Sequence, residues 1–575
     1  MMHPALTLLI GFSSEESDLP RDGEFPQTLR ATAQHGTFRR ARSSFVVSLI
    51  ILATIMCSLA VNAEDWPQWR GANCGGVSSS TKKLPEKFSP TENVRWSAVV
   101  GDGISSPCVC AGRVYCTAMT TPDGVTLEKP EFKDLTQFVV MCFDQQSGKK
   151  LWQKSFSAGP EPLPPIHAVN SYASATPAAD AERVYVYFTR IGLVALDATD
   201  GHQVWQYSVP EPFFIFDWGP GMSPVLCDNK LLFVQDDDLT PALYALNKVT
   251  GELLWMDDRS DMAVSYSHPI VSETASGGEI VVAGTGKLIG YEPETGRRKW
   301  RADVFCRNIK TTPASVNGTI YVSVEGYGMS YQWRATADSD GDGKITKAEI
   351  LASRKDQQSK IPDAFWKKFE RGDANGDGVL EGEEIDNAFL DPRNKAGLLD
   401  AETRARGGEE KDWKKWDAEL IKEASIQAVR GGGEGDVSAT HVLWKHKSKA
   451  PDHLISPLVA EGKMLLVKGN GILTSYETEK GTAVGKPRRL KGDPGSILAS
   501  PVLGDGKIYI AAENGKIVVV RNDDSGEELA VNDMGEPCIG TPAIADGQIF
   551  LRTRTQLWCI ETPETSPSSA SATNP

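Results

Sequence analysis

The chain has 575 residues, of which 24% are charged and 40% hydrophobic, and its formal net charge is −15. This negative balance argues against nucleic acid as a partner, because nucleic-acid binding relies on basic surface that neutralises phosphates. Length alone does not set the number of domains, since all-β folds can run to several hundred residues as one unit.

The first 63 residues are predicted to be a leader. A basic segment (39–42) precedes an apolar run (45–60), and Ala63 follows it. This order is typical of a secretory signal peptide, which predicts cleavage after Ala63 and export to the periplasm or the extracellular space. The alternative is that the segment stays uncleaved as a membrane anchor, although the apolar run is shorter than the ~20 residues that a membrane span requires. This anchor is the one route by which we expect membrane contact.

Nine of the ten cysteines would remain in the mature chain, because Cys57 lies in the leader. Met56 precedes Cys57 where a lipid-attachment signal has a small residue, so we do not expect a lipoprotein. An odd number of cysteines in an oxidising compartment leaves at least one thiol unpaired. One predicted sheet holds four cysteines, which allows a disulfide there without fixing its pairing: Cys108, Cys110, Cys116 and Cys142.

Repeats occupy most of the chain from residue 64 to 561. Each opens with Ser-Pro, Thr-Pro or His-Pro and continues as three apolar strands, a turn that ends in Gly, and a strand with Trp. The proline spacings are 70, 47, 45, 44, 144, 44 and 41 residues, and ~40 to 50 is the period of a four-stranded propeller blade. The openings are Ser106-Pro107, Thr176-Pro177, Ser223-Pro224, His268-Pro269, Thr312-Pro313, Ser456-Pro457, Ser500-Pro501 and Thr541-Pro542.

The turn before each outer strand is predicted to place Gly in the left-handed conformation after an Asx-type start. The Trp four residues later lies on the outer strand, where its flat ring can pack against the neighbouring blade. We interpret these tryptophans as structural. The glycines are Gly148, Gly201, Gly251 and Gly296, and the tryptophans are Trp152, Trp205, Trp255 and Trp300.

These repeats resemble the pyrroloquinoline-quinone-type, BamB-like repeat family, which implies an all-β, eight-bladed propeller of four-stranded blades with tryptophan docking motifs. The segments 65–76 and 94–99 are similar to the start of exported bacterial members. The last repeat ends at Glu561 without its own outer strand. We expect the strand of Trp96 to supply it, because such closure removes the open edges of the ring.

The 144-residue spacing predicts an insert of about 100 residues in blade five, since 44 belong to a typical repeat. Trp444 restores the docking position after the insert. The predicted domains are the leader (1–63), the first propeller part (64–328), the insert (329–436), the second propeller part (437–561) and a disordered tail (562–575).

Two twelve-residue stretches of the insert, 338–349 and 373–384, place oxygen atoms at the spacing that calcium requires. Side chains at positions 1, 3, 5 and 12 and the carbonyl at position 7 are the ligands, and position 6 is Gly. Both stretches match the EF-hand family, so the insert is predicted to be an α-helical EF-hand pair with two Ca²⁺ sites. The ligands are Asp338, Asp340, Asp342, Lys344 and Glu349, and Asp373, Asn375, Asp377, Val379 and Glu384.

Helices and a short ribbon are expected around these loops. Ile345 and Leu380, at position 8, are predicted to join the loops as a two-stranded ribbon. Phe365 and Phe369 indicate the helix that enters the second loop. A further amphipathic helix over 412–427 either caps the pair or docks the insert on the propeller.

A propeller ligand, if there is one, is expected where residues before the innermost strands converge on the central channel. A merely hydrated channel is the alternative. The candidates are Asn170, Tyr172, Asp217, Trp218, His268, Arg307, Asn308, Lys310 and His453.

Functions of different classes fit this fold. The main hypothesis is an exported, non-catalytic, calcium-binding scaffold whose propeller face binds a protein or a glycan. The resemblance implies two alternatives, an outer-membrane-assembly factor and a quinone-dependent dehydrogenase. Neither an adjacent cysteine pair nor a Cys-x-x-Cys-His motif occurs, so we expect no pyrroloquinoline quinone and assign no catalytic residue.

Overall fold

A computed structural model describes residues 64–122, 136–262, 264–275, 277–304, 309–324, 336–354, 361–382, 384–385, 388, 425–447 and 454–563. The chain divides into two compact units, Met1–Asn62 and Ala63–Pro575, and all described residues belong to the second. Outside these ranges lie the predicted leader, residues 412–424 of the helix expected over 412–427, most of the predicted tail, and the candidates Arg307, Asn308 and His453.

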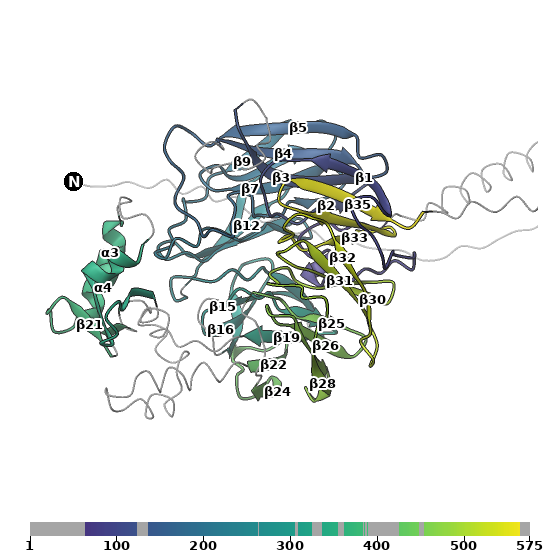
Figure 1. Ribbon diagram of the computed structural model, residues 1–575. Helices are drawn as coiled ribbons and strands as arrows, with labels where there is room; N and C mark the ends of the chain where they lie inside the picture. Colours follow the sequence, from purple (N-terminus) through teal and green to yellow (C-terminus); the bar gives the residue numbers. More distant parts are fainter. Residues whose placement is uncertain are drawn as a thin grey trace, which may run out of the picture. The chain divides into compact units, whose positions relative to one another are not determined.

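Eight antiparallel sheets follow one another along the chain and form the predicted eight-bladed propeller (Figure 1). Blade one contains β2 (Cys108–Cys110), β3 (Arg113–Thr120), β4 (Gln137–Asp144) and β5 (Lys150–Ser157). Blade two contains β6 (Ala178–Ala179), β7 (Arg183–Phe188), β8 (Gly192–Asp197) and β9 (Gln203–Tyr207). Blade three contains β10 (Val225–Cys227), β11 (Lys230–Gln235), β12 (Ala242–Asn247) and β13 (Leu253–Asp258). Blade four contains β14 (Ile270–Thr274), β15 (Gly277–Gly284), β16 (Lys287–Tyr291) and β17 (Arg298–Asp303).

The second half of the ring repeats this order with two irregularities. Blade five contains β18 (Ala314–Val316), β19 (Thr319–Val324), β22 (Ser425–Arg430) and β24 (Val442–Lys447). Blade six contains β25 (Leu458–Ala460), β26 (Lys463–Val467), β27 (Ile472–Glu477) and β28 (Ala483–Arg489). Blade seven contains β29 (Val502–Gly504), β30 (Lys507–Ala511), β31 (Lys516–Arg521) and β32 (Glu528–Asp533). Blade eight contains β33 (Ala543–Ala545), β34 (Gln548–Arg552), β35 (Gln556–Glu561) and β1 (Val94–Val99).

The two ends of the ring meet in blade eight. Strand β1 pairs with β35 in antiparallel register, with Trp96 opposite Cys559, and Figure 1 shows the two strands side by side. The predicted closure by the strand of Trp96 is therefore confirmed. The pairing covers an edge that would otherwise expose free N–H and C=O groups.

Blade five differs from the expected insert boundary. Strand β22 pairs with β19 along its whole length, although its residues fall within 329–436. Ile426 and Ala428 of β22 join one apolar cluster and Val429 joins another, and side chains that alternate between two faces are those of a strand. The helix expected over 412–427 therefore extends three residues too far, because residues 425–427 belong to strand β22. Strand β23 (Gly435–Asp436) then pairs in parallel with β17, so blade four gains a fifth strand.

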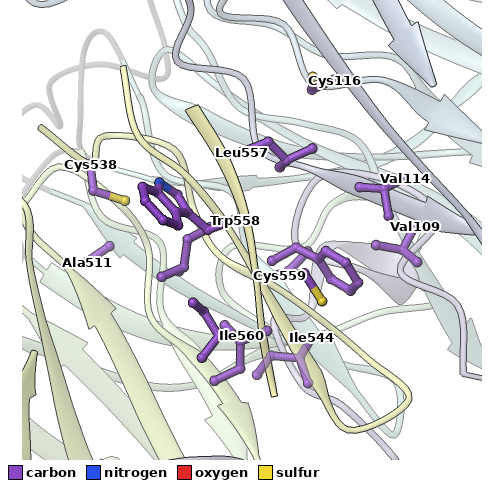
Figure 2. Close-up of a cluster of buried hydrophobic side chains, with 14 of the residues drawn as sticks. Val109, Val114, Cys116, Ala511, Cys538, Ile544, Leu557, Trp558, Cys559 and Ile560 are labelled. Carbon is purple, nitrogen blue, oxygen red and sulfur yellow. The ribbon is translucent and has the colours of Figure 1, made fainter. Parts of the chain in front are cut away.

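Apolar side chains from neighbouring blades meet in continuous clusters. Figure 2 shows one, in which Val109 of blade one and Ala511 of blade seven lie near Ile544, Leu557 and Cys559 of blade eight. All five are fully buried. Because burial of apolar area is the main stabilising term, at ~25 cal/mol per Å², the blades stabilise one another through these clusters.

The cysteines of the described residues form no disulfide. Cys108, Cys110, Cys116 and Cys142 of blade one are free and buried, so the disulfide allowed by the sequence is absent from this sheet. Cys116 faces a different apolar cluster from Cys108, Cys110 and Cys142. Alternating strand positions thus place these thiols on both faces of the blade, where they act as small apolar side chains.

The docking tryptophans pack as predicted, with one exception. The indole N–H of Trp152 donates to the carbonyl of Ala198 in the next blade at 3.0 Å, and a Cβ on Gly201 would lie 2.5 Å from the ring. The indole of Trp300 instead donates to Glu279 of its own blade at 2.9 Å. The corresponding turn of blade five is replaced by the longer segment 431–441, and Glu279 accepts from the N–H of its Gly432.

The residues before the repeat prolines link the blades around the channel. The N–H of Ser106 donates to the hydroxyl of Thr176 in the next blade at 3.0 Å. The same contact recurs six more times, at 2.9–3.2 Å, up to Thr541 of blade eight. In blade four the acceptor is the imidazole of His268. The Ser-Pro and Thr-Pro dipeptides are therefore interblade hydrogen-bonding sites.

Among the helices that the described residues form, none is both long and apolar enough to cross a membrane.

Candidate functional site

Residues 66–78, which we call the channel segment, run along the innermost strands. Trp66 forms an antiparallel bridge with Val109 of blade one, and the carbonyl of Pro67 accepts from Ala179 of blade two at 2.8 Å. The carboxamide of Gln68 accepts from the N–H of Leu226 in blade three at 2.8 Å. Each contact satisfies a backbone group that points away from its own sheet.

The second half of the channel segment continues to blades four, six and seven. Asn73, in η1 (Ala72–Cys74), accepts from the N–H of Val271 at 2.6 Å and donates to its carbonyl at 2.7 Å. Arg70 donates to the carbonyl of Pro457 at 3.0 Å, and Val77 forms a parallel bridge with Leu503. The segment therefore contacts the inner strands of six blades.

Trp69 and His268 stack within the channel, with ring centroids 4.3 Å apart. Burial lowers the pKa of His268 to about 3, and the charge of Arg70 acts in the same direction. The imidazole is therefore neutral at physiological pH. It accepts from the N–H of Ser223 and lies 3.1 Å from the hydroxyl of Thr312, so it connects the channel segment to the interblade contacts.

The remaining channel candidates have structural partners. Asn170 donates to the carbonyls of Trp218 and Pro220 at 2.8 and 3.1 Å, and Tyr172 donates to the carbonyl of Pro164. The ammonium of Lys310 lies 5.2 Å from the ring centroid of Trp218. Of the candidates that are described, the Trp218–Lys310 pair is the one that resembles a cation–π contact site.

The two predicted calcium loops lie side by side. Strand β20 (Lys344–Thr346) pairs with β21 (Val379–Glu381), and Ile345 is opposite Leu380 as the sequence predicts. Helix α3 (Lys347–Ser353) follows the first loop, and α4 (Asp363–Gly372) enters the second. Before the first loop, residues 336–337 are helical.

The carboxylates of the first loop converge. One oxygen from each of Asp338, Asp340 and Asp342 lies within 4.8 Å of the others, and Gly343 has a positive φ of 85°. Glu349 accepts from the N–H of Thr346 at 2.9 Å. Burial opposes ionisation of Glu349, but hydrogen bonds from the loop outweigh it and hold its pKa below the usual value. Glu349 is thus ionised at neutral pH.

The second loop repeats this geometry. Asp373 accepts from the N–H of Gly378 at 2.9 Å, and Asn375 donates to Asp377 at 2.9 Å. Glu384 accepts from the N–H of Ala374 at 3.0 Å. Lys344 is the first residue of β20, and Val379 is the first residue of β21. The backbone carbonyls of these two residues therefore occupy the same place in their loops.

An apolar contact fixes the insert to blade three, which the sequence analysis did not anticipate. Ile215 and Phe216 of the propeller join the cluster of Ile350, Phe365 and Phe369 in the insert. The segment is held by Asp237 and Asp238, which accept from the N–H groups of Phe213 and Ile215 at 2.9 Å. The signal was the run of four apolar residues at 213–216, which is unusual for a connecting loop.

The chain is similar in sequence to known β-propeller proteins. The sequence model of a family described as outer membrane protein assembly factor BamB matches residues 89–213 and 136–338. A protein named outer membrane protein assembly factor BamB, from Yersinia pestis, is 23% identical over 488 residues, which cover 83% of this chain and 98% of that protein. Both matches support a propeller of BamB-like repeats.

Solved structures align over most of the chain at low similarity. BamB from Moraxella catarrhalis shows 10% identity and a TM-score of 0.43 over 82% of this chain and 99% of its own. A europium-containing methanol dehydrogenase shows 11% identity and a TM-score of 0.42 over 87% and 91%. With TM-scores below 0.5, neither alignment distinguishes a binding protein from an enzyme.

Proposed function

We propose that the chain is an exported, non-catalytic propeller scaffold that binds a protein partner and takes part in outer-membrane assembly. The observation that carries this proposal is the sequence match that spans 98% of a relative named outer membrane protein assembly factor. A match of that extent involves the whole ring rather than a single blade. It favours assembly over the more general scaffold expected from the sequence.

The channel geometry limits where a partner can bind. Trp69, Arg70 and His268 lie together in the channel, and the side chains of Arg70 and His268 are buried. Burial lowers the pKa of Arg70 to about 10, so it keeps its charge at neutral pH. Residues of the chain itself thus occupy part of the channel, and the proposal places the partner on the surfaces of the ring that these residues leave open.

Loss of the gene tests this role. Its deletion in the native host should lower the amount of folded outer-membrane protein recovered from membranes, and re-expression should restore it. A second strain that expresses the protein without residues 329–424 separates the propeller from the insert. Unchanged outer-membrane protein in the deletion strain would contradict the proposed assembly role.

We also propose that the insert binds two calcium ions as a pair of EF-hands. The donor set is that of a hard cation, with carboxylates, one carboxamide and two backbone carbonyls. The convergence of Asp338, Asp340 and Asp342 and the ribbon between Ile345 and Leu380 support it. Calcium would neutralise clustered carboxylates and stabilise the insert against the propeller.

Isothermal titration calorimetry tests the calcium sites one at a time. Glu349→Ala and Glu384→Ala each remove a bidentate ligand, so each variant should bind one ion fewer than the wild-type protein. Glu370→Ala, on the exposed side of α4, is the matched control and should leave the stoichiometry unchanged. Equal stoichiometry in all four proteins would refute calcium binding at these loops.

A further inference from the structure

The inner strands present one equivalent backbone position in every blade, two residues after the repeat proline. In blade one this residue is Val109, and its N–H donates to Trp66 of the channel segment at 2.9 Å. Four more of these N–H groups donate to the same segment. They belong to Ala179, Leu226, Val271 and Leu503, at 2.6–2.8 Å.

Blades five, six and eight depart from this pattern, and the equivalent residue of blade eight is Ile544. Blades five and six are neighbours in the ring. Their equivalent residues are Ser315 and Val459, and Val459 lies opposite Met464 in the same register in which Val109 lies opposite Val114. In antiparallel pairs of this kind the N–H and C=O point away from the partner strand. Within the described ranges, no backbone hydrogen bond reaches either residue from the channel segment.

A cavity of about 740 Å³ opens at this place. It lies between the channel segment, represented by Gly75 and Val77, and the inner strands β18 and β25, and both Ser315 and Val459 line it. This volume is within the ~300–1,000 Å³ range of ligand sites. The free backbone edges of two adjacent strands therefore face an open space.

The lining selects an uncharged occupant. Lys83 forms an ion pair with Asp505 at 3.0 Å, and Glu461 accepts from the carboxamide of Asn522 at 3.0 Å, so the charged side chains of the cavity already have partners. The other lining residues are small, apolar or hydroxyl-bearing, apart from Asn73, whose carboxamide already pairs with the backbone of Val271. An extended strand of neutral residues matches both this lining and the free N–H and C=O groups.

We propose that an uncharged segment of a partner protein binds in this cavity as an extended strand that pairs with β18 and β25. The channel segment already contacts five inner strands at the equivalent position, and the incoming segment would continue the same contact at blades five and six. In this mode the main chain supplies the affinity and alternate side chains supply the specificity. The inference rests on the proposed protein-binding role and deepens it by naming the site and the recognition chemistry.

A phage-displayed library of random octapeptides, panned on the wild-type protein, provides the probe. Val459→Pro removes the N–H of β25 that faces the cavity, and Pro is tolerated where that N–H takes no part in the ladder. Val459→Ala removes a similar side-chain volume and keeps the N–H. For the synthesised best binder, Val459→Pro should weaken binding by tenfold or more, whereas Val459→Ala should change it by less than about threefold.

A chemical control leaves the protein unaltered. Two versions of the same peptide are N-methylated, one at the odd residues and one at the even residues. Both keep their side chains, and each loses the N–H donors on one side of the extended strand. The version that loses the donors facing β18 and β25 should no longer bind. Failure to enrich any peptide, equal binding by the two Val459 variants, or full binding of both N-methylated peptides would overturn the proposal. The two proposals can fail separately. If peptide binding depends on the N–H of Val459 but the deletion strain has normal outer-membrane protein, the binding site stands and only the assembly role is refuted.

Discussion

Arg354 of the insert and Asp217 of the propeller form an ion pair at 3.1 Å, and both side chains are almost fully buried, at 3% and 2% exposure. Arg354 follows helix α3 directly, five residues after the first predicted calcium loop ends at Glu349. The pair lies next to the apolar contact between Phe213 and Phe365, whose ring centroids are 5.9 Å apart. The insert is therefore attached to blade three by both charge and apolar packing.

Removal of one partner should detach the insert. Asp217→Ala leaves the guanidinium of Arg354 buried without its carboxylate, which typically costs ~3–5 kcal/mol. We expect faster hydrogen exchange of the amides in α3 and α4, measured by mass spectrometry, while the propeller strands keep their protection. Glu370→Ala removes an exposed ion pair with Lys347 and should cost less than ~1 kcal/mol. Equal exchange in both variants would show that the buried pair does not hold the insert.

The turn glycines offer a paired test of tryptophan docking. Gly201 and Gly462 both have φ of 75°, but a Cβ on Gly201 would meet the ring of Trp152 at 2.5 Å, whereas a Cβ on Gly462 would meet no atom within 4 Å. Both Ala variants pay ~1–2 kcal/mol for the left-handed backbone. Gly201→Ala should cost a further ~1–3 kcal/mol for the overlap.

Thermal unfolding of the two variants separates the cost of the left-handed backbone, which both share, from the cost of the overlap with Trp152, which Gly201→Ala alone has. Near-ultraviolet circular dichroism is the readout, because its tryptophan signal changes with packing. A similar midpoint for Gly201→Ala and Gly462→Ala would mean that the indole ring moves aside without loss.

His268 should make the stability of the ring depend on pH. Its pKa is 6.5 as a free group and about 3 in the fold because of burial, so between these values the unfolded chain binds one more proton than the folded one. Stability should therefore fall as the pH drops below 6.5, by about 1.4 kcal/mol per pH unit from this group. His268→Thr restores the hydroxyl of the other blades and should reduce the slope.

The control for this pH effect is His202→Thr, because His202 is exposed in a surface turn. Urea unfolding at a series of pH values from 4 to 7 measures the slopes. If the His268 and His202 variants show the slope of the wild-type protein, His268 does not carry the effect.

Much of the propeller follows from local sequence patterns. The repeat prolines, the turn glycines such as Gly201 and the incomplete last repeat predict eight blades and their closure through Trp96, because each feature has a fixed place in one four-stranded unit. The pairing of Ile345 with Leu380 is local in the same sense, since both lie at position 8 of a fixed loop.

Contacts between distant segments could not be predicted in this way. Trp69 stacks on His268 because closure of the ring brings them together. Residues 66–78 have no strand periodicity from which their contacts with the inner strands could be predicted. The attachment of Phe213 to Phe365 likewise depends on where the insert lies. The sequence predicts that the four cysteines of blade one share one sheet, but which face Cys116 takes depends on strand register.

The central claim is that this propeller binds a protein of outer-membrane assembly, and cross-linking mass spectrometry on intact cells of the native host tests it most directly. Lysines of the propeller, such as the exposed Lys83, should cross-link to an outer-membrane assembly protein, and the same links should be recovered from the purified complex. Absence of any such cross-link, together with quinone- and calcium-dependent oxidation of alcohols by the purified protein, would contradict the account and identify the chain as a dehydrogenase.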